Sequence, residues 1–114
     1  MWVFSKDGFY SMVEDRDDPD TLIVRSRVEG DIEALWPDAE VIHTPDGDYA
    51  YRAALSRQEV AAAIAKEVLE ISYSNYKDHI TDKRRSPFYI QVWETMWRMQ
   101  DALMVTPVRR GRRG

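Results

Sequence analysis

A helix signal in the middle of the chain is the strongest constraint on its fold. Ser56-Arg57-Gln58-Glu59 is a capping box, in which the serine hydroxyl accepts from the Glu59 amide and the Glu59 carboxylate reaches back to the Ser56 amide. Apolar residues then recur at helical spacing, at Val60, Ile64, Val68 and Ile71. We predict a helix from Ser56 to about Ile71, with these four residues on one stripe.

Three β-prone segments open the chain. Trp2–Ser5 and Phe9–Glu14 flank Lys6-Asp7-Gly8, and Asp-Gly is a strong tight-turn signal, so the two segments predict a hairpin. The acidic, proline-containing run Asp15–Asp20 predicts a loop. Thr21–Arg27 alternates with period two and predicts a third strand.

The segment between this strand and the capping box predicts a helix and two more strands. Val28–Trp36 has apolar residues at helical spacing and is followed by a proline that stops a helix. Glu40–Thr44 and Tyr49–Leu55 lie on either side of the turn-forming Pro45-Asp46-Gly47-Asp48, so we expect them to pair.

The C-terminal third predicts helix and then a basic tail. Ser72–Lys83 is polar and partly helical in pattern, and Ser86-Pro87 is typical of a helix start. The last helix is expected to end near Leu103, with its apolar stripe at Tyr89, Val92, Met96, Met99 and Leu103. Residues 105–114 show no periodicity, and we expect a flexible basic tail.

These elements predict an α+β fold with the order β-β-β-α-β-β-α-α. We expect an antiparallel sheet of about five strands with its helices on one face. A right-handed crossover would insert Tyr49–Leu55 beside Thr21–Arg27, which gives a ferredoxin-like split β-α-β element. Residues 1–104 are expected to form a single domain.

Composition excludes several classes of function. The chain has 114 residues and no cysteine, which excludes disulfides, thiolate catalysis and cysteine-ligated metal sites. No stretch approaches the roughly 20 apolar residues that span a bilayer. Met1–Asp7 lacks the pattern of a signal peptide, so we expect a cytoplasmic protein without a membrane partner.

Charge is distributed unevenly along the chain. The formal net charge is −4, but residues 1–82 carry eight basic and 18 acidic side chains, while residues 83–114 carry eight basic and two acidic ones. A basic end can bind a polyanion, or it can simply balance the acidic remainder.

The sequence offers little catalytic chemistry. His43 and His79 have no partner at a metal-ligand spacing, and no nucleophile or phosphate-loop motif is present. We therefore expect a protein that is not an enzyme and that needs no metal or cofactor. A small enzyme acting on a phosphorylated ligand is the less favoured reading.

One predicted surface carries arginines. If the apolar side chains of Thr21–Arg27 face the helices, Arg25 and Arg27 face the other way, and Arg52 joins them from the neighbouring strand. We expect Tyr10 and Met12 to lie on this face too. Guanidinium groups bind carboxylates or phosphates in pairs of hydrogen bonds, although these arginines could also bridge to the many acids of the chain.

Two further segments are rich in aromatic residues. Tyr73–His79 is either an anchor for the end of the long helix or part of a binding patch. The last helix is apolar over a wide arc, so Tyr89, Trp93 and Trp97 belong either to the core or to a homodimer interface.

Four short motifs resemble an uncharacterised family of small bacterial and phage-encoded proteins. The motifs are Trp2…Gly8-Phe9, Val24-Arg25-Ser26-Arg27, Asp48-Tyr49-Ala50-Tyr51-Arg52 and Tyr73-Ser74-Asn75-Tyr76-Lys77. Proteins of that family open in the style W-x-x-T-x-x-G-F-F-S and continue with R-x-R, D-Y-x-Y-R and Y-x-N-F/Y-K. The similarity covers about Met1 to Gln100. It implies no catalytic residue, but it groups Arg25, Arg27, Tyr49, Tyr51, Arg52, Asn75 and Lys77 into one pattern, which we take as a candidate binding site.

We expect a non-enzymatic protein that binds a protein partner. If the gene is carried by a phage, the partner would be a host factor that the protein modulates or inhibits. The alternative is nucleic-acid binding through the arginine-bearing sheet face and the basic C-terminal third, whose candidate contacts are Lys83, Arg84, Arg85, Arg109, Arg110, Arg112 and Arg113.

Overall fold

The structure is a computed structural model that describes residues 1–104. These residues form two compact units, Met1–Ser74 and a second unit that begins at Asn75. Each unit is described below by itself, and a single domain over residues 1–104 stays a prediction. The expected flexible tail, residues 105–114, lies outside the described residues.

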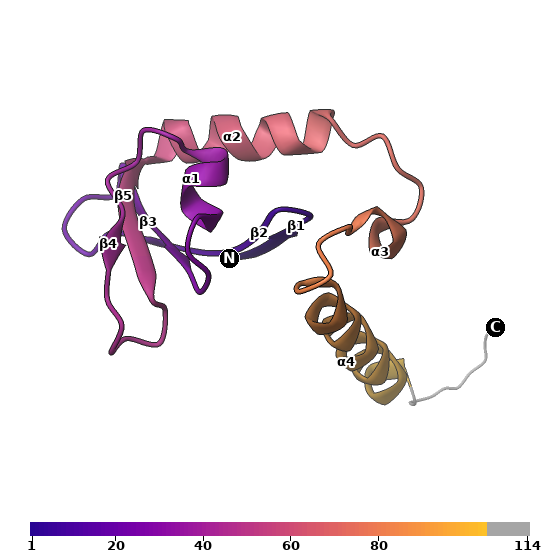
Figure 1. Cartoon of the computed structure of the whole chain (residues 1–114). Coiled ribbons are helices and arrows are strands. Elements are labelled where there is room, and N and C mark those ends of the chain that lie inside the picture. The colour runs from indigo at the N-terminus through magenta and orange to yellow at the C-terminus, as the bar shows by residue number, and fades with distance from the viewer. Residues whose placement is uncertain (105–114) are drawn as a thin grey trace. The chain divides into compact units, whose positions relative to one another are not determined.

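The first unit is built on an antiparallel sheet of five strands, which confirms the predicted α+β class (Figure 1). The strands are β1 (Trp2–Ser5), β2 (Gly8–Glu14), β3 (Thr21–Ser26), β4 (Ile42–His43) and β5 (Tyr51–Ser56). Their order across the sheet is β1-β2-β3-β5-β4. The last strand in sequence, β5, therefore lies between β3 and β4 and pairs with both.

The N-terminal hairpin forms as predicted, with its register set by the turn. Phe4 lies opposite Phe9, and Ser5 lies opposite Gly8. The Ser5 hydroxyl closes the turn, because it donates to the Gly8 carbonyl at 3.2 Å and accepts from the Gly8 amide at 3.1 Å. This closure leaves only Lys6 and Asp7 between the strands, which is the loop length that tight hairpins favour.

Strand β4 is much shorter than the predicted Glu40–Thr44. The Thr44 amide donates to the Ala50 carbonyl at 2.6 Å, and the Thr44 hydroxyl donates to the Tyr49 carbonyl at 2.8 Å. These bonds close a loop over the segment that was expected to begin β5. Regular pairing is consequently limited to Ile42 and His43 on one side and to residues from Tyr51 onward on the other.

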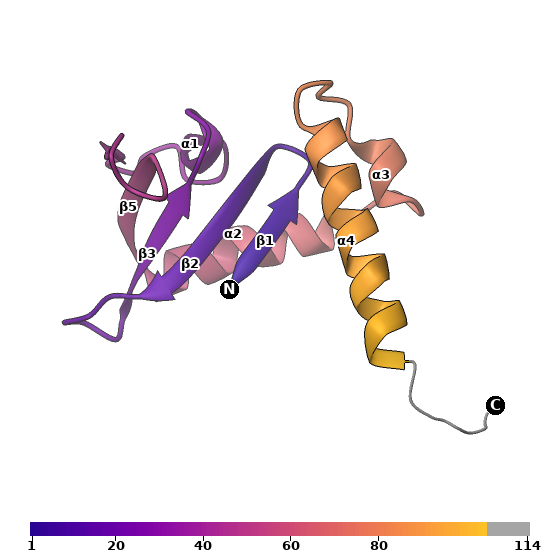
Figure 2. The same cartoon turned by 90° about the horizontal axis from the view of Figure 1, so that it is seen from below.

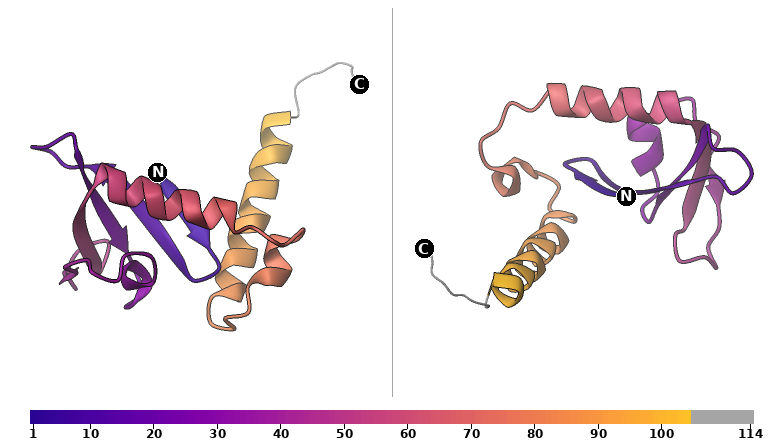
Figure 3. Two further views of the ribbon diagram at one scale, coloured as in Figure 1. Left: turned by 90° about the horizontal axis from the view of Figure 1, so that it is seen from above. Right: turned by 180° about the vertical axis from the view of Figure 1, so that it is seen from behind.

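Helices α1 (Asp31–Leu35) and α2 (Arg57–Leu69) lie on the same side of the sheet (Figures 1 and 3). Trp36 ties them together, because its indole N–H donates to the Glu59 carbonyl at 3.1 Å. Both helices contribute to one buried cluster, which consists of Tyr10, Met12, Val24, Ile32, Trp36, Ala53, Leu55 and Val60. Burial of such side chains stabilises a fold by roughly 1.5–3 kcal/mol each, so this cluster holds the unit together.

Helix α1 starts later than expected, whereas α2 begins where its capping box predicts. Gly30 has φ of +93°, a left-handed conformation that ends any helix begun at Val28, so α1 starts only at Asp31. The capping box of α2 is confirmed, since Ser56 and Glu59 bond reciprocally. Of the apolar stripe expected on this helix, Val60 is buried, whereas Val68 and Ile71 are more than half exposed and Ile71 lies beyond the end of α2.

The second unit contains α3 (Tyr76–His79) and α4 (Ser86–Met104). The partly helical pattern expected for Ser72–Lys83 thus resolves into one short helix, and the element order gains an α element over the predicted β-β-β-α-β-β-α-α. Within residues 1–104, no helix has the length and apolar character that crossing a membrane requires.

Candidate functional site

The sheet of the first unit has one face that neither α1 nor α2 covers, which we call the uncovered face (Figure 2). Side chains of directly opposite residues point to the same side of an antiparallel sheet. The register therefore places Trp2, Ser11, Arg25 and Arg52 in one row across β1, β2, β3 and β5. Phe4 and Phe9 form a second row, and Val13, Ile23 and Ala54 form a third.

Three aromatic rings gather on the hairpin part of this face. Phe4 and Phe9 stack with their ring centroids 4.6 Å apart, and Trp2 meets Phe9 edge-on at 5.9 Å. Trp2 keeps 66% of its surface exposed. Aromatic residues of this kind supply a large contact area at little loss of conformational entropy, because the rings already support one another.

Arginines occupy the neighbouring strands. Arg25 and Arg52 are direct cross-strand partners on β3 and β5. The guanidinium of Arg25 donates to the buried Ser11 hydroxyl at 2.7 Å and lies 4.7 Å from the centroid of the Tyr49 ring. Arg27 lies over the same ring at 4.1 Å. Tyr49 is only 4% exposed, so it forms a fixed support on which both guanidiniums rest.

Asp48 completes what we call the arginine cluster, which consists of Arg25, Arg27, Asp48, Tyr49 and Arg52. Its carboxylate pairs with Arg52 at 3.1 Å, and its backbone carbonyl accepts from Arg27. Among the described residues, this is the one ion pair that the three arginines make. The cluster therefore carries three positive charges against one negative charge.

Sequence reasoning placed the arginines on the correct face but was wrong about their neighbours on the hairpin. Tyr10 and Met12 lie in the core, on the side of the helices. The physical reason is the register of β2 against β3, which sets Met12 opposite the core residue Val24 and Ser11 opposite Arg25. The aromatic residues of the face, Trp2, Phe4 and Phe9, were missed, although alternation along Trp2–Ser5 was a readable signal.

The structure separates the pattern that the family resemblance grouped. Arg25, Arg27, Tyr49 and Arg52 come together, whereas Tyr51 points to the helix side and stacks on His43 with ring centroids 4.8 Å apart. Asn75 and Lys77 belong to the second unit. There the Asn75 side chain caps α3 by accepting from the Asp78 amide at 3.1 Å, and Lys77 lies 3.8 Å from the Trp93 ring centroid.

The basic segment before α4 is locally balanced by one carboxylate. Asp82 lies 3.6 Å from Arg84 and 3.3 Å from Arg85, and the Arg84 amide donates to it at 2.9 Å. That amide, followed by the charge of Arg84 and of Arg85, lowers the pKa of Asp82 below its ordinary value. Lys83 lies in the same turn, and the candidate contacts Arg109, Arg110, Arg112 and Arg113 lie outside the described residues.

The aromatic residues of α4 have unequal surroundings. Tyr89 stacks against Tyr76 of α3 with ring centroids 6.4 Å apart, and Lys77 rests on Trp93. Trp93 and Trp97 meet edge-on at 5.0 Å. No residue of α4 is buried, so the core reading of this helix finds no support within the described residues.

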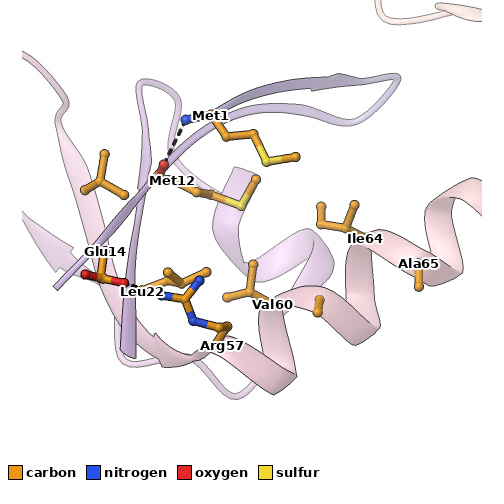
Figure 4. Close-up of a pocket in the computed structure, with 10 residues that line it drawn as sticks. Met1, Met12, Glu14, Leu22, Arg57, Val60, Ile64 and Ala65 are labelled. Carbon is orange, nitrogen blue, oxygen red and sulfur yellow. Dashed lines mark hydrogen bonds and ion pairs between the residues drawn. The ribbon is translucent and has the colours of Figure 1, made fainter. Parts of the chain in front are cut away.

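An apolar groove lies on the helix side of the first unit (Figure 4). Its volume is about 590 Å³, and its apolar lining includes Met1, Met12, Leu22, Val60 and Ile64. The charged pair at its edge is already satisfied, because Arg57 contacts Glu14 at 2.7 Å and also donates to the Pro19 carbonyl. The groove thus presents hydrocarbon surface without the convergent polar groups that orient a small ligand.

Among residues 1–104, no group of three or more histidine, aspartate or glutamate side chains is placed to hold a metal ion. Comparison of the chain with family models, with curated proteins and with solved structures found no match. The resemblance to small bacterial and phage-encoded proteins therefore stays a prediction.

Proposed function

We propose that this chain is a non-enzymatic binding protein that recognises a protein partner through the uncovered face of its sheet. The observation that carries the proposal is the aromatic group of exposed Trp2 and half-buried Phe4 and Phe9, which shares one face with Arg25 and Arg52. Tryptophan, tyrosine and arginine are the residues that most often dominate the binding energy of protein interfaces.

The position of these residues on a sheet supports this proposal. Strands β1, β2 and β3 are joined by continuous antiparallel ladders, so the side chains of the face are held in fixed register before any partner arrives. Preorganised groups lose less conformational entropy on binding. Val13 is also exposed on the same face, and it adds apolar area beside the aromatic rings.

Nucleic-acid binding is the second candidate, because stacked aromatic rings beside arginines also suit single-stranded nucleic acid. The net negative charge of the first unit disfavours nucleic-acid binding. Residues 1–74 carry 16 acidic side chains and seven basic ones, and such a surface repels a polyanionic backbone. A protein segment with only one or two negative charges meets far less of this repulsion than a polyanionic backbone does.

We also propose that the sheet contains a ferredoxin-like split β-α-β element. Strand β5 lies between β3 and β4, and α1 connects those two outer strands in sequence. This topology supports a split β-α-β element of the ferredoxin-like kind, with the N-terminal hairpin as an extension of its sheet.

The test is affinity capture from expressing cells followed by calorimetry with the purified partner. The full chain is compared with Trp2→Ala and with Leu69→Ala, a control that removes an exposed apolar side chain from the end of α2. We expect Trp2→Ala to weaken binding at least tenfold, an effect of about 1.4 kcal/mol that is typical of an interface hot spot, and Leu69→Ala to have no effect. Equal effects of the two substitutions, or capture of nucleic acid that survives physiological salt, would contradict the proposal.

A further inference from the structure

The arginine cluster keeps positive charge in a strongly acidic unit. Three of the seven basic side chains of residues 1–74 belong to this cluster, with Arg25 and Arg27 over the Tyr49 ring, while only one of the 16 carboxylates of that unit contacts any of the three. Like charges directly opposite each other on a sheet destabilise it, and Arg25 faces Arg52 in this way. Asp48 pairs with Arg52, but no carboxylate among the described residues contacts Arg25, although the unit carries 16 of them.

Arg25 also has an unused donor. Its Nε is buried and makes no hydrogen bond to any described residue, although one of its terminal nitrogens donates to Ser11. A buried donor without an acceptor costs free energy. A guanidinium that turns toward an incoming carboxylate would gain an acceptor for Nε and for a terminal nitrogen together, in the geometry that arginine favours.

We propose that Arg25 and Arg52 bind a carboxylate side chain of an acidic segment in the protein partner. This inference rests on the proposed function and names the chemistry of the partner. The positive charges of the cluster match the negative charge of such a segment, and a carboxylate bridging the two strands removes the repulsion between the two guanidiniums. Arg27, held over Tyr49, adds a third positive charge beside the site.

The distance between Trp2 and Arg25 sets how far apart the two contacting residues of the partner segment must be. Arg25 lies on β3, two strands away from Trp2 on β1, and adjacent strands are about 4.8 Å apart, so the two positions are separated by about 10 Å. Extended chain rises about 3.3 Å per residue. The recognised segment therefore carries its acidic residue about three positions from an apolar residue that covers Trp2.

The test uses a capped eight-residue peptide in which a pair of glutamates begins three positions after a leucine. A matched peptide has glutamines in place of the two glutamates. Arginine side-chain NMR of the full chain follows the Nε–H signals. We expect a saturable shift of the Arg25 signal with the acidic peptide only. Arg25→Gln and Arg52→Gln should each weaken binding about fivefold, whereas Lys66→Gln, the same charge change on an exposed part of α2, should not.

The proposal is overturned if the shift does not saturate, if the glutamine peptide binds equally well, or if Lys66→Gln weakens binding as much as the arginine variants do. Tighter binding of inorganic phosphate or of a thymidine octanucleotide would overturn it as well. Partner capture that depends on Trp2 but not on Arg25 or Arg52 would leave the proposed function standing and remove only this inference.

A different observation concerns α4 of the second unit. Eight of its large apolar side chains are exposed, and they are Phe88, Ile90, Trp93, Met96, Trp97, Met99, Leu103 and Met104. Helix α3 contacts this surface at Tyr89, which stacks on Tyr76, and at Trp93, on which Lys77 rests. At about 100° per residue, the apolar side chains cover roughly 200° of the helix, while Glu94, Arg98 and Asp101 share a narrow arc on the other side.

We infer that α4 pairs with α4 of a second copy of this chain. Taking about 150–250 Å² for a fully exposed large side chain, the eight residues present on the order of 800 Å², which is the area that each partner contributes to a standard stable interface. Ser86 and Gln100 are the polar residues inside the apolar arc, and neither is charged. The one charge that the described residues place on this surface is Lys77 of α3, which rests on Trp93 at its edge. The remaining apolar surface offers no charge that would repel a second copy across a two-fold axis.

The test is sedimentation velocity of the full chain up to about 100 µM, a range that detects micromolar association. We expect a dimer that Met96→Glu and Trp97→Glu each convert to monomer, because both place a charge inside the apolar arc. Gln91→Glu, the control, adds the same charge on the polar side of the helix and should leave the dimer intact. A monomer throughout the range, or a dimer that survives both Met96→Glu and Trp97→Glu, would overturn the inference.

Discussion

The ring of Tyr10 passes directly over Gly8. A β-carbon on Gly8 would lie 2.5 Å from the Tyr10 hydroxyl oxygen and 2.7 Å from the ring carbon that bears it. Tyr10 is fully buried, and its hydroxyl donates to the Asp31 carbonyl at 2.7 Å. The glycine at the start of β2 therefore admits the contact that joins the hairpin to α1.

Gly8→Ala tests this close approach. The buried ring cannot move away without breaking its hydrogen bond, so we expect a loss of about 2 kcal/mol in the free energy of unfolding, measured by urea titration. Gly47→Ala is the control, because its β-carbon would come no nearer than 3.3 Å to another residue. Equal losses for the two substitutions would show that the Tyr10 contact is not the cause.

The capping box of α2 gives a second prediction. The Ser56 hydroxyl accepts from the Glu59 amide at 3.1 Å, and the Glu59 carboxylate accepts from the Ser56 amide at 3.3 Å. Ser56→Ala should lower the free energy of unfolding by about 1 kcal/mol, since it leaves a helix N–H without its partner. Gln58→Ala, an exposed change in the same turn, should have little effect in the same urea titration.

The loop before β3 makes a pH-dependent contribution. The Thr21 hydroxyl donates to the Asp18 carboxylate at 2.7 Å and the Asp20 amide donates to it at 3.0 Å, and these bonds lower the pKa of Asp18, with the Thr21 bond the larger cause. The contribution is present above the ordinary pKa of the carboxyl group and is lost as pH falls through the lowered value. NMR titration of Asp18 should show the low pKa, and Thr21→Val should raise it. An unchanged titration in Thr21→Val would refute this cause.

The charge of the arginine cluster gives a prediction about affinity. Asp48 supplies the one carboxylate that contacts the cluster, and its side chain is 70% exposed. Asp48→Asn should tighten binding of the acidic peptide about threefold and steepen its dependence on salt, because it removes a competing negative charge. Asp17→Asn, the same change in the loop before β3, is the control. Calorimetry in which both variants behave alike would contradict a local effect.

Local sequence signals predicted the elements of the first unit well but not their exact lengths. The Asp-Gly turn, the alternation of Thr21–Arg27 and the capping box each depend on a few neighbouring residues, and all three predicted elements are present. Shortening of α1 and β4 depends on the φ angle of Gly30 and on the hydrogen bonds of Thr44, which no periodicity reveals.

The candidate site was predictable only in part for a similar reason. Alternation along one strand placed Arg25, and pairing placed Arg52 beside it. The partners of these residues on the hairpin depend on the register between β2 and β3, and a shift by one residue exchanges the faces. That is why Tyr10 and Met12 were expected where Phe9 and Ser11 lie.

Site-specific photo-cross-linking tests the central claim most directly. A benzophenone amino acid replaces Trp2 on the uncovered face or Leu69 on α2 in the full chain, and cells are irradiated before the adducts are separated and identified by mass spectrometry. The account predicts a discrete protein adduct from position 2 and none from position 69. A nucleic-acid adduct at position 2, or equal adducts from both positions, would contradict it.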